Sequence, residues 1–186
     1  TEQFKYHLPP ELIAQEPLAD RLASRLMVVK RQSNSLTHCY FKELINFLNS
    51  GDCLVINETK VRPARIKAQK STGAAVELLL LKEQEPAVWE VLAWPAKRLK
   101  KGGQIFINTE LKAEVVAELT AGRRLVKFSA ADGYSLNGSL KAKILQAASL
   151  ALPPYIHKPL KQPERYQTVY SRQLGSVAAP TAGLHF

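Results

Sequence analysis

The strand pattern is clearest in ARIKAQKSTGAAVELLLL, residues 64–81. Two short strand-like runs, residues 64–68 and 75–81, flank the turn signal Ser71-Thr72-Gly73. Four similar runs follow, separated by turn signals such as Gly102-Gly103; they cover residues 88–93, 104–107, 113–119 and 124–128. Short strands at this close spacing predict a small antiparallel β-barrel.

The sequence on either side of these strands has a different character. Residues 26–29 and 53–56 are short apolar runs that predict buried strands, and apolar residues between 41 and 48 recur at helical spacing. After the barrel, residues 138–150 also have helical spacing, and residues 165–171 could form one or two helical turns. We therefore predict an α/β (mixed α+β) domain of residues 1-62 plus 153-186, with the barrel of residues 63-152 inserted into it.

The last residues, GLHF (183–186), have the composition of a structured segment rather than of a polar, unconstrained terminus. We therefore expect the chain to be truncated at its C-terminal end and the outer α/β domain to be incomplete.

Composition and charge narrow the classes of function. The formal net charge is +10 and the pI is about 9.7, which favours a polyanionic partner. No run approaches the roughly 20 apolar residues of a membrane span, and the N-terminus lacks a signal-peptide run, so we expect a cytoplasmic protein with no membrane partner. Cys39 and Cys53 form no Cys-x-x-Cys motif or Cys/His cluster, so we expect no metal site. We expect two reduced, buried thiols, and the alternative is a single disulfide between them. No Gly-x-Gly-x-x-Gly motif indicates a Rossmann-type cofactor.

A basic cluster, KVRPARIK (60–67), lies where the outer domain gives way to the barrel. In a strand starting at Arg65, the side chains of Arg65, Lys67 and Gln69 point to one face. Such a face can contact successive phosphates or hold a carboxylate. The alternative is a solvated strand face that protects an exposed edge.

A second basic segment, WPAKRLKK (94–101), combines an aromatic ring with four cations. Aromatic side chains can stack on unpaired bases while cations follow the phosphate backbone. The alternative is a basic turn with Trp94 packed in the barrel core.

The segment GSVAAPTAGLH (175–185) is rich in small residues, which let the backbone approach a ligand closely. Thr181 and His185 are four residues apart, and both can donate and accept hydrogen bonds. His185 could be a general base near neutral pH. The alternative is a hydrogen-bonded structural histidine.

Several long blocks, in order along the chain, carry a specific resemblance. They are FKYHLPPELIAQEPLADRLASRLMV (4–28), LVINETKVRPARI (54–66), VELLLL (76–81), WPAKRLKKG (94–102), LPPYI (152–156) and ERYQTVYSRQLGSVAAPTAGLHF (164–186). The chain resembles the N-terminal half of the S-adenosylmethionine:tRNA ribosyltransferase-isomerase family of queuosine biosynthesis. Glu58 and Lys60 stand where the family often has Asp and Arg, and the family continues well past LHF.

The resemblance implies a reaction, its substrates and a fold. The family transfers the ribosyl unit of S-adenosylmethionine to the aminomethyl group of a deazaguanine base at the tRNA wobble position. The ribosyl unit is isomerised, giving epoxyqueuosine in tRNA and releasing adenine and methionine. S-adenosylmethionine is thus a co-substrate, and no prosthetic group or metal is expected. The implied fold is an α/β domain with an inserted barrel, and we expect a monomer that binds the anticodon stem-loop.

The resemblance also suggests roles for residues of this chain. His185 and Glu58 are the candidates for acid/base chemistry, and Thr181 is the third candidate catalytic residue. The sulfonium donor is expected along the segment formed by Ala178, Ala179, Pro180, Thr181, Ala182 and Gly183. The tRNA is expected to contact Lys60, Arg62, Arg65, Lys97 and Arg98.

Two other functions agree with part of the sequence. One is a non-catalytic RNA-binding module built on the barrel, which explains the charge and Trp94. The other is an enzyme that acts on a small anionic metabolite, held by the basic cluster. We also expect the 186-residue chain to be inactive by itself.

Overall fold

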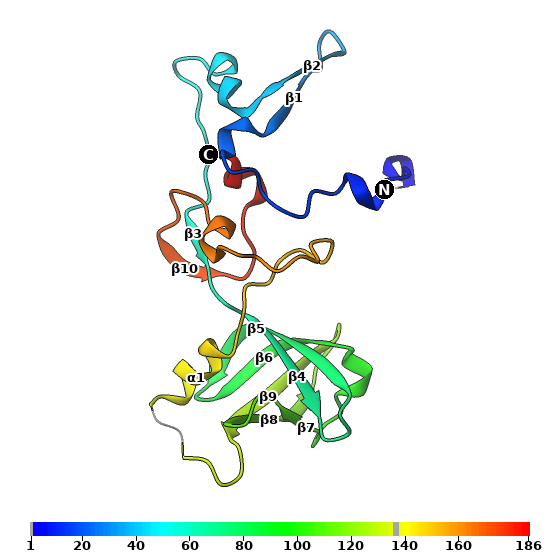
Figure 1. Cartoon of the computed structure of the whole chain (residues 1–186), viewed down its shortest axis with the longest axis vertical. Helices are drawn as coiled ribbons and strands as arrows, with labels where there is room; N and C mark the ends of the chain where they lie inside the picture. The colour runs from blue at the N-terminus through cyan, green and yellow to red at the C-terminus, as the bar shows by residue number, and fades with distance from the viewer. Residues whose placement is uncertain (1, 136–137) are drawn as a thin grey trace. The chain divides into compact units, whose positions relative to one another are not determined.

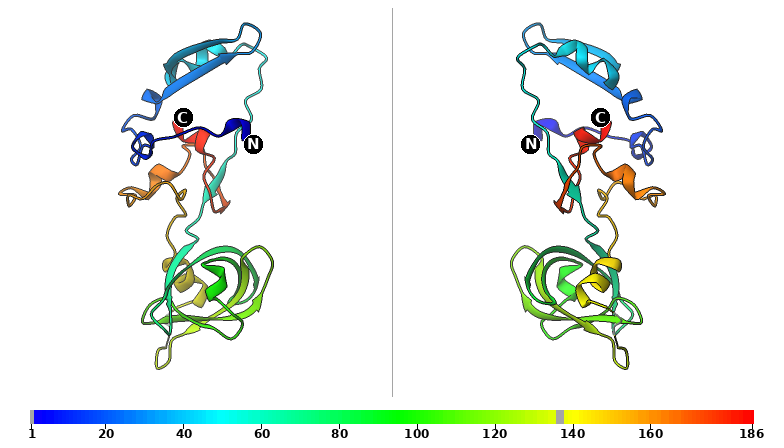
Figure 2. Two further views of the ribbon diagram at one scale, coloured as in Figure 1. Left: turned by 90° about the vertical axis from the view of Figure 1, so that its right-hand side faces the viewer. Right: turned by 90° about the vertical axis from the view of Figure 1, so that its left-hand side faces the viewer.

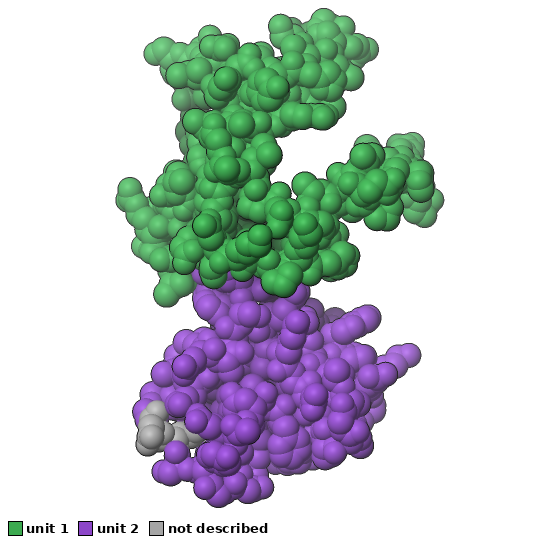
Figure 3. Space-filling model, viewed as in Figure 1, with its two compact units in different colours: residues 1–60, 152–186 green, residues 61–151 purple. Residues whose placement is uncertain are grey.

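A computed structural model describes residues 2–135 and 138–186 (Figure 1). The chain forms two compact units (Figure 3). The outer unit contains the residues up to Lys60 and those from Leu152 to Phe186, and the second unit is the stretch Val61–Ala151 inserted between them. That each unit is a separate domain, with the boundaries expected at residues 62/63 and 152/153, stays a prediction.

The inserted unit is a closed antiparallel barrel of six strands, ordered β4-β5-β6-β9-β8-β7 (Figures 1 and 2). The strands are β4 (Arg65–Lys70), β5 (Ala75–Glu85), β6 (Val88–Trp94), β7 (Gln104–Phe106), β8 (Leu111–Glu118) and β9 (Arg123–Ala130). Pairing of Gln69 with Phe106 and of Lys70 with Ile105 closes the barrel between β4 and β7. Each of the six predicted runs overlaps one strand, so the predicted barrel is confirmed.

Alternation along the strands separates the barrel core from its outer surface. In β4, Ile66 and Ala68 are buried, whereas Lys67 and Gln69 are exposed. The largest fully buried side chains of the barrel strands come from all six strands: Ile66, Leu78, Leu80, Val91, Ile105, Leu111, Val115, Val126 and Phe128. The core is therefore aliphatic apart from a few rings.

The alternative that placed Trp94 in the barrel core is wrong. In β6 the residues that point inward are Trp89, Val91 and Ala93. Trp94 lies one residue out of step with them, and 74% of its surface is exposed. The core tryptophan is Trp89, at 4% exposure.

The helix expected over residues 138–150 is shorter in the structure. It is α1 (Leu140–Gln146), which buries Ile144 and packs near β9. Ser149 forms a β-bridge with Arg65, through N–H···O bonds of 2.9 and 2.8 Å in the two directions. A bridge requires extended backbone, so the helix has to end before it.

The outer unit has two small two-stranded sheets. One pairs β1 (Arg25–Lys30) with β2 (Ser35–Tyr40), and the other pairs β3 (Thr59–Val61), whose last residue is the first of the inserted unit, with β10 (Gln173–Ser176). Short 3-10 helices accompany them: η1 (Glu2–Phe4), η2 (Pro10–Leu12), η3 (Arg21–Ala23), η4 (Phe41–Phe47), η6 (Pro163–Tyr166) and η7 (Thr181–His185). In the barrel unit, η5 (Ala96–Arg98) follows β6. None of the helices within the described ranges is long and apolar enough to cross a membrane.

Several details expected of the outer unit are wrong, although a mixed unit with an inserted barrel is confirmed. The run at residues 26–29 is a strand, but it forms a hairpin with β2 and leaves Met27 and Val29 mostly exposed. Residues 53–56 form no strand, and Val55 is 88% exposed, because an apolar run without a paired partner has no ladder to join. Both cysteines are free thiols as expected, but neither is buried: Cys39 is half-buried and Cys53 is exposed.

A buried arginine joins η5 to the barrel wall. Arg124, on β9, is only 6% exposed. Its Nε donates to the carbonyl of Leu99 at 2.6 Å, and its Nη2 donates to the carbonyl of Ala96 at 2.7 Å. A buried guanidinium is tolerated only where its donors are satisfied. Here Nε and Nη2 bind the two carbonyls of η5 and its C-cap, Nη1 donates to the carbonyl of Arg123 at 2.7 Å, and a Glu118 carboxylate oxygen lies 3.4 Å from Nη2.

We expect Arg124→Met to lower the free energy of unfolding by about 3 kcal/mol, because it leaves buried carbonyls without donors. The matched control is Lys127→Met, an exposed cation on the same strand, with an expected change within about 0.5 kcal/mol. Urea denaturation followed by tryptophan fluorescence measures both, since the buried Trp89 changes environment on unfolding. Equal losses in the two variants would contradict the proposed role of Arg124.

Candidate functional site

The small-residue segment ends in a tightly packed turn, η7. Gly183 is buried in it, and a Cβ at this position would lie 2.3 Å from Tyr170 Oη and 2.9 Å from Thr168 Cγ2. The backbone of Gly183 does not adopt positive φ. Glycine is therefore needed for space rather than for backbone freedom, and the turn is fixed against Thr168 and Tyr170.

His185 stands at the end of this turn with its side chain exposed. Its Nδ1 lies 3.0 Å from Ser24 Oγ, and its ring lies beside Phe41 with the two centroids 5.6 Å apart. When Nδ1 carries the proton and donates it to Ser24, Nε2 keeps a lone pair that can accept a proton. Ser24 was missed by the sequence analysis because 161 residues separate it from His185 and no local motif links them.

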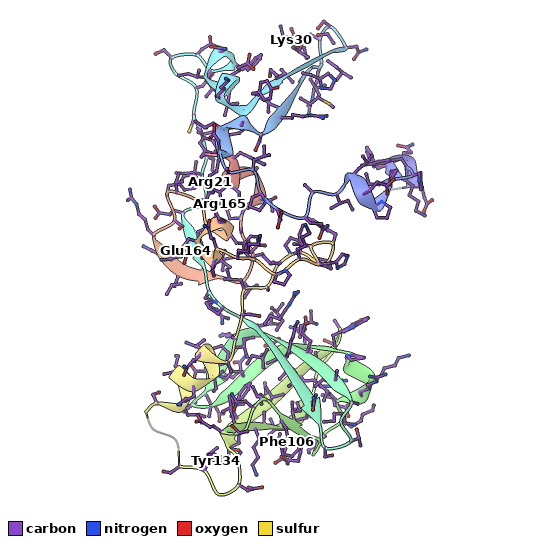
Figure 4. All side chains as sticks on the ribbon, in the orientation of Figure 1. Arg21, Lys30, Phe106, Tyr134, Glu164 and Arg165 are labelled. Atoms are coloured by element: carbon purple, nitrogen blue, oxygen red, sulfur yellow. The ribbon has the colours of Figure 1, made fainter. Side chains whose placement is uncertain are left out.

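Two arginines, labelled in Figure 4, bind backbone carbonyls near this turn: Arg21 binds the turn itself, and Arg165 binds the N-terminal segment. Arg21 Nη1 donates to the carbonyl of Leu184 at 2.9 Å, and Arg165 donates to the carbonyl of Leu18 at 2.5 Å. Burial lowers the pKa of Arg21, and the charge of Arg165 lowers it further. The Arg21 contact thus joins the N-terminal segment to the turn that carries His185.

The residues expected to bind the sulfonium donor lie on a segment held by its own hydrogen bonds. Ser176 Oγ donates to the carbonyl of Ala178 at 2.6 Å and accepts from its N–H at 3.1 Å. The N–H of Gly183 donates to the carbonyl of Pro180 at 2.8 Å. Ala178, Thr181 and Ala182 are exposed, whereas Ala179 and Pro180 are half-buried. Thr181, Gly183 and His185 therefore share one turn.

Glu58 is held elsewhere in the outer unit, just before β3. Its carbonyl accepts from the N–H of Arg172 at 2.7 Å, and Arg172 Nε lies 3.7 Å from its carboxylate. In the part of the chain that the structure describes, no hydrogen bond or ion pair joins Glu58 to His185. Over the same residues, no group of three or more His, Cys, Asp or Glu side chains is placed to hold a metal ion.

The predicted basic cluster divides into side chains with different partners. Lys60 is exposed. Arg62 Nη2 donates to the carbonyls of Leu80 and Leu81 at 3.0 and 2.8 Å, and burial lowers its pKa. Arg65 Nε lies 3.0 Å from a Glu77 carboxylate oxygen. The guanidinium groups of Arg62 and Arg65 thus bind partners within the barrel and stabilise it.

The barrel carries an open groove of about 890 Å³. Lys67, Trp94, Arg98 and Phe106 line it, together with the smaller side chains of β4 and β5. Trp94 is 74% exposed and Phe106 is 41% exposed, and Figure 4 labels Phe106. Lys97 and Arg98 are both exposed on η5. Phe106 was missed from the sequence because it was counted within a strand, and strand periodicity alone did not show which face it occupies.

Comparisons with known proteins agree over nearly the whole chain. A family model described as "Queuosine biosynthesis protein" matches residues 1–186. The S-adenosylmethionine:tRNA ribosyltransferase-isomerase of Acetivibrio thermocellus is 48% identical over 185 residues, which cover 98% of this chain and 52% of that protein. The chain thus spans about half the length of this curated relative.

A solved structure is also similar in sequence. The crystal structure of S-adenosylmethionine tRNA ribosyltransferase from Thermotoga maritima is 44% identical, over 68% of this chain and 44% of that chain, with a TM-score of 0.34. The family model covers the whole chain, from the N-terminal segment through the barrel to η7. This chain therefore belongs to the queuosine biosynthesis protein family.

Proposed function

We propose that this chain provides one half of an enzyme that transfers and isomerises the ribosyl unit of S-adenosylmethionine onto tRNA. The acceptor is the aminomethyl-deazaguanine base at the wobble position, the products are epoxyqueuosine in tRNA, adenine and methionine, and the enzyme works as a monomer. The observation that carries this proposal is the 48% identity to a ribosyltransferase-isomerase over 98% of the chain. The basic barrel supports a tRNA partner.

The turn at residues 181–185 is the proposed place of acid/base chemistry. The reaction requires removal of a proton beside the positive sulfur and a neutral amine nucleophile, so it needs a proton acceptor. His185 is exposed, and Ser24 can fix the tautomer that leaves Nε2 free to accept a proton. Glu58 is the second candidate. The backbone of Ala178–Gly183, with the Thr181 hydroxyl, is the proposed donor site.

The tRNA is proposed to meet the protein through Lys60, Lys97 and Arg98, which are exposed. Arg62 and Arg65 would act mainly through their positive charge, since their guanidinium groups already bind barrel carbonyls and Glu77. Counterion release on neutralising phosphates would provide most of the affinity, without base specificity.

We expect His185→Ala to reduce kcat by at least a hundredfold, the usual contribution of a general base. The measurement follows adenine and methionine release in a protein in which this chain is continued by the remaining part of the Acetivibrio thermocellus relative. Ser24→Ala should reduce kcat less, by roughly tenfold, because it loosens the ring without removing it.

The control is His38→Ala, an exposed histidine on β2 of the same unit, which should retain full activity. A loss of no more than about twofold in His185→Ala would remove the catalytic role of His185. Absence of product release from both the continued protein and the 186-residue chain, with tRNA binding intact, would favour a non-catalytic RNA-binding module.

Replacing Lys97 and Arg98 together with Gln should weaken tRNA binding equally for all sequences. If each cation meets one phosphate, the slope of log K against log salt concentration should become less steep by about 1.5. Filter binding at several salt concentrations measures this slope. The control is Lys141→Gln, whose ammonium group is paired with Glu83. An unchanged slope would exclude this surface from the tRNA contact.

A further inference from the structure

The groove on the barrel has the side chains of a site for unpaired nucleotides. We propose that it binds a single-stranded segment of RNA, with one base stacked on Trp94 and the phosphates beside Lys67 and Arg98. This inference rests on the proposed function in that it takes RNA as the partner, and it adds where and how an unpaired base is held.

Strand register places the lining residues in two neighbouring rows on the outer face. One row is Lys67, Glu77 and Trp94, which are paired across β4, β5 and β6. The other row is Phe106, Gln69 and Ala75, paired across β7, β4 and β5. Trp94 on β6 and Phe106 on β7 are thus separated by three strand-to-strand steps. At the usual spacing of neighbouring strands, their backbones lie about 14 Å apart across the sheet.

The small side chain of Ala75 lowers the surface between the two rings. Ala75 occupies the outer face of β5, next to Glu77, where a larger residue would fill the groove. The result is a hollow with an aromatic ring at either side and strand backbone beneath. This geometry suits a planar base, which needs a flat apolar ring to stack on and an open route for the chain that carries it.

Charge in the groove favours a phosphate-bearing ligand. In the described part of the chain, neither Lys67 nor Arg98 makes an ion pair, so both charges are available to a ligand. The one carboxylate in the lining, that of Glu77, is 3.0 Å from Arg65 Nε and thus compensated. The barrel stretch of residues 61–151 has fifteen Lys and Arg against eight Asp and Glu, so the surrounding field is positive.

The cationic side of the groove is held in place from within the barrel. Arg98 belongs to η5, and Arg124 binds the carbonyls of Ala96 and Leu99 on both sides of it. Trp94 lies at the end of β6, where Ala93 N–H donates to the carbonyl of Gly122 at 3.1 Å. A ligand therefore meets a ring and a guanidinium whose backbone supports are already fixed, which reduces the entropy lost on binding.

The test uses the 186-residue chain and two RNA probes, a short stem-loop and a blunt duplex of equal length. Trp94 is exposed and Trp89 is buried, so stacking should quench the fluorescence of Trp94. We expect the stem-loop to quench and the duplex to quench little. Trp94→Ala should abolish the quenching and weaken stem-loop binding by about tenfold to a hundredfold. Trp94→Phe should retain most of the affinity.

Tyr134→Ala is the matched control, because Tyr134 is a 51% exposed aromatic in the same unit that does not line the groove (Figure 4). Unchanged stem-loop affinity in Trp94→Ala would overturn the inference, as would equal quenching by the duplex or by a glutamate-rich peptide. If the inference fails while adenine is still released from the continued protein, the proposed function stands. If stem-loop binding still depends on Trp94 but the continued protein releases no adenine, the inference about the groove holds and the proposed function fails.

Discussion

The organisation of the barrel's basic surface depends on one buried guanidinium. Arg124 reaches out of β9 and satisfies the carbonyls of Ala96 and Leu99, the residues at either end of the segment that carries Lys97 and Arg98. The buried side chain of Leu99 packs in the barrel core and anchors the same segment. A charge that costs free energy to bury is thus compensated by backbone acceptors and by the Glu118 carboxylate, and the exposed cations next to it gain a defined position.

In the outer unit, a steric constraint at Gly183 fixes the position of the turn that ends in His185. The missing Cβ of Gly183 allows Tyr170 and Thr168 to close on the turn, while Arg21 binds the carbonyl of Leu184. His185 follows directly and meets Ser24, at the other end of the sequence. The turn is therefore defined by packing and by long-range contacts, while its histidine remains open to solvent. The acid/base role proposed for His185 would use this fixed, exposed imidazole.

The barrel could be predicted from the sequence because each strand has turn signals and alternation of its own. Residues whose roles depend on contacts distant in sequence could not be predicted. No local motif marks Ser24. In the sequence Arg124 looks like any other cation on a strand, because its role depends on its hydrogen bonds to the carbonyls of Ala96 and Leu99. The apolar run at residues 53–56 predicted a buried strand that does not form, because apolar residues alone do not provide a partner strand to pair with. Whether Trp94 points into the barrel or to solvent depends on which residues of β6 face inward, and a shift of one residue reverses this assignment.

The bridge between Arg65 and Ser149 ties together the two ends of the barrel stretch. Closing a loop costs conformational entropy that rises with its length, but a folded insertion with joined ends behaves as a short, preclosed loop. Once the barrel has formed, the two parts of the outer unit, although distant in sequence, are connected as if by a brief turn. The bridge thus lowers the entropic cost that a large insertion places on the unit that receives it.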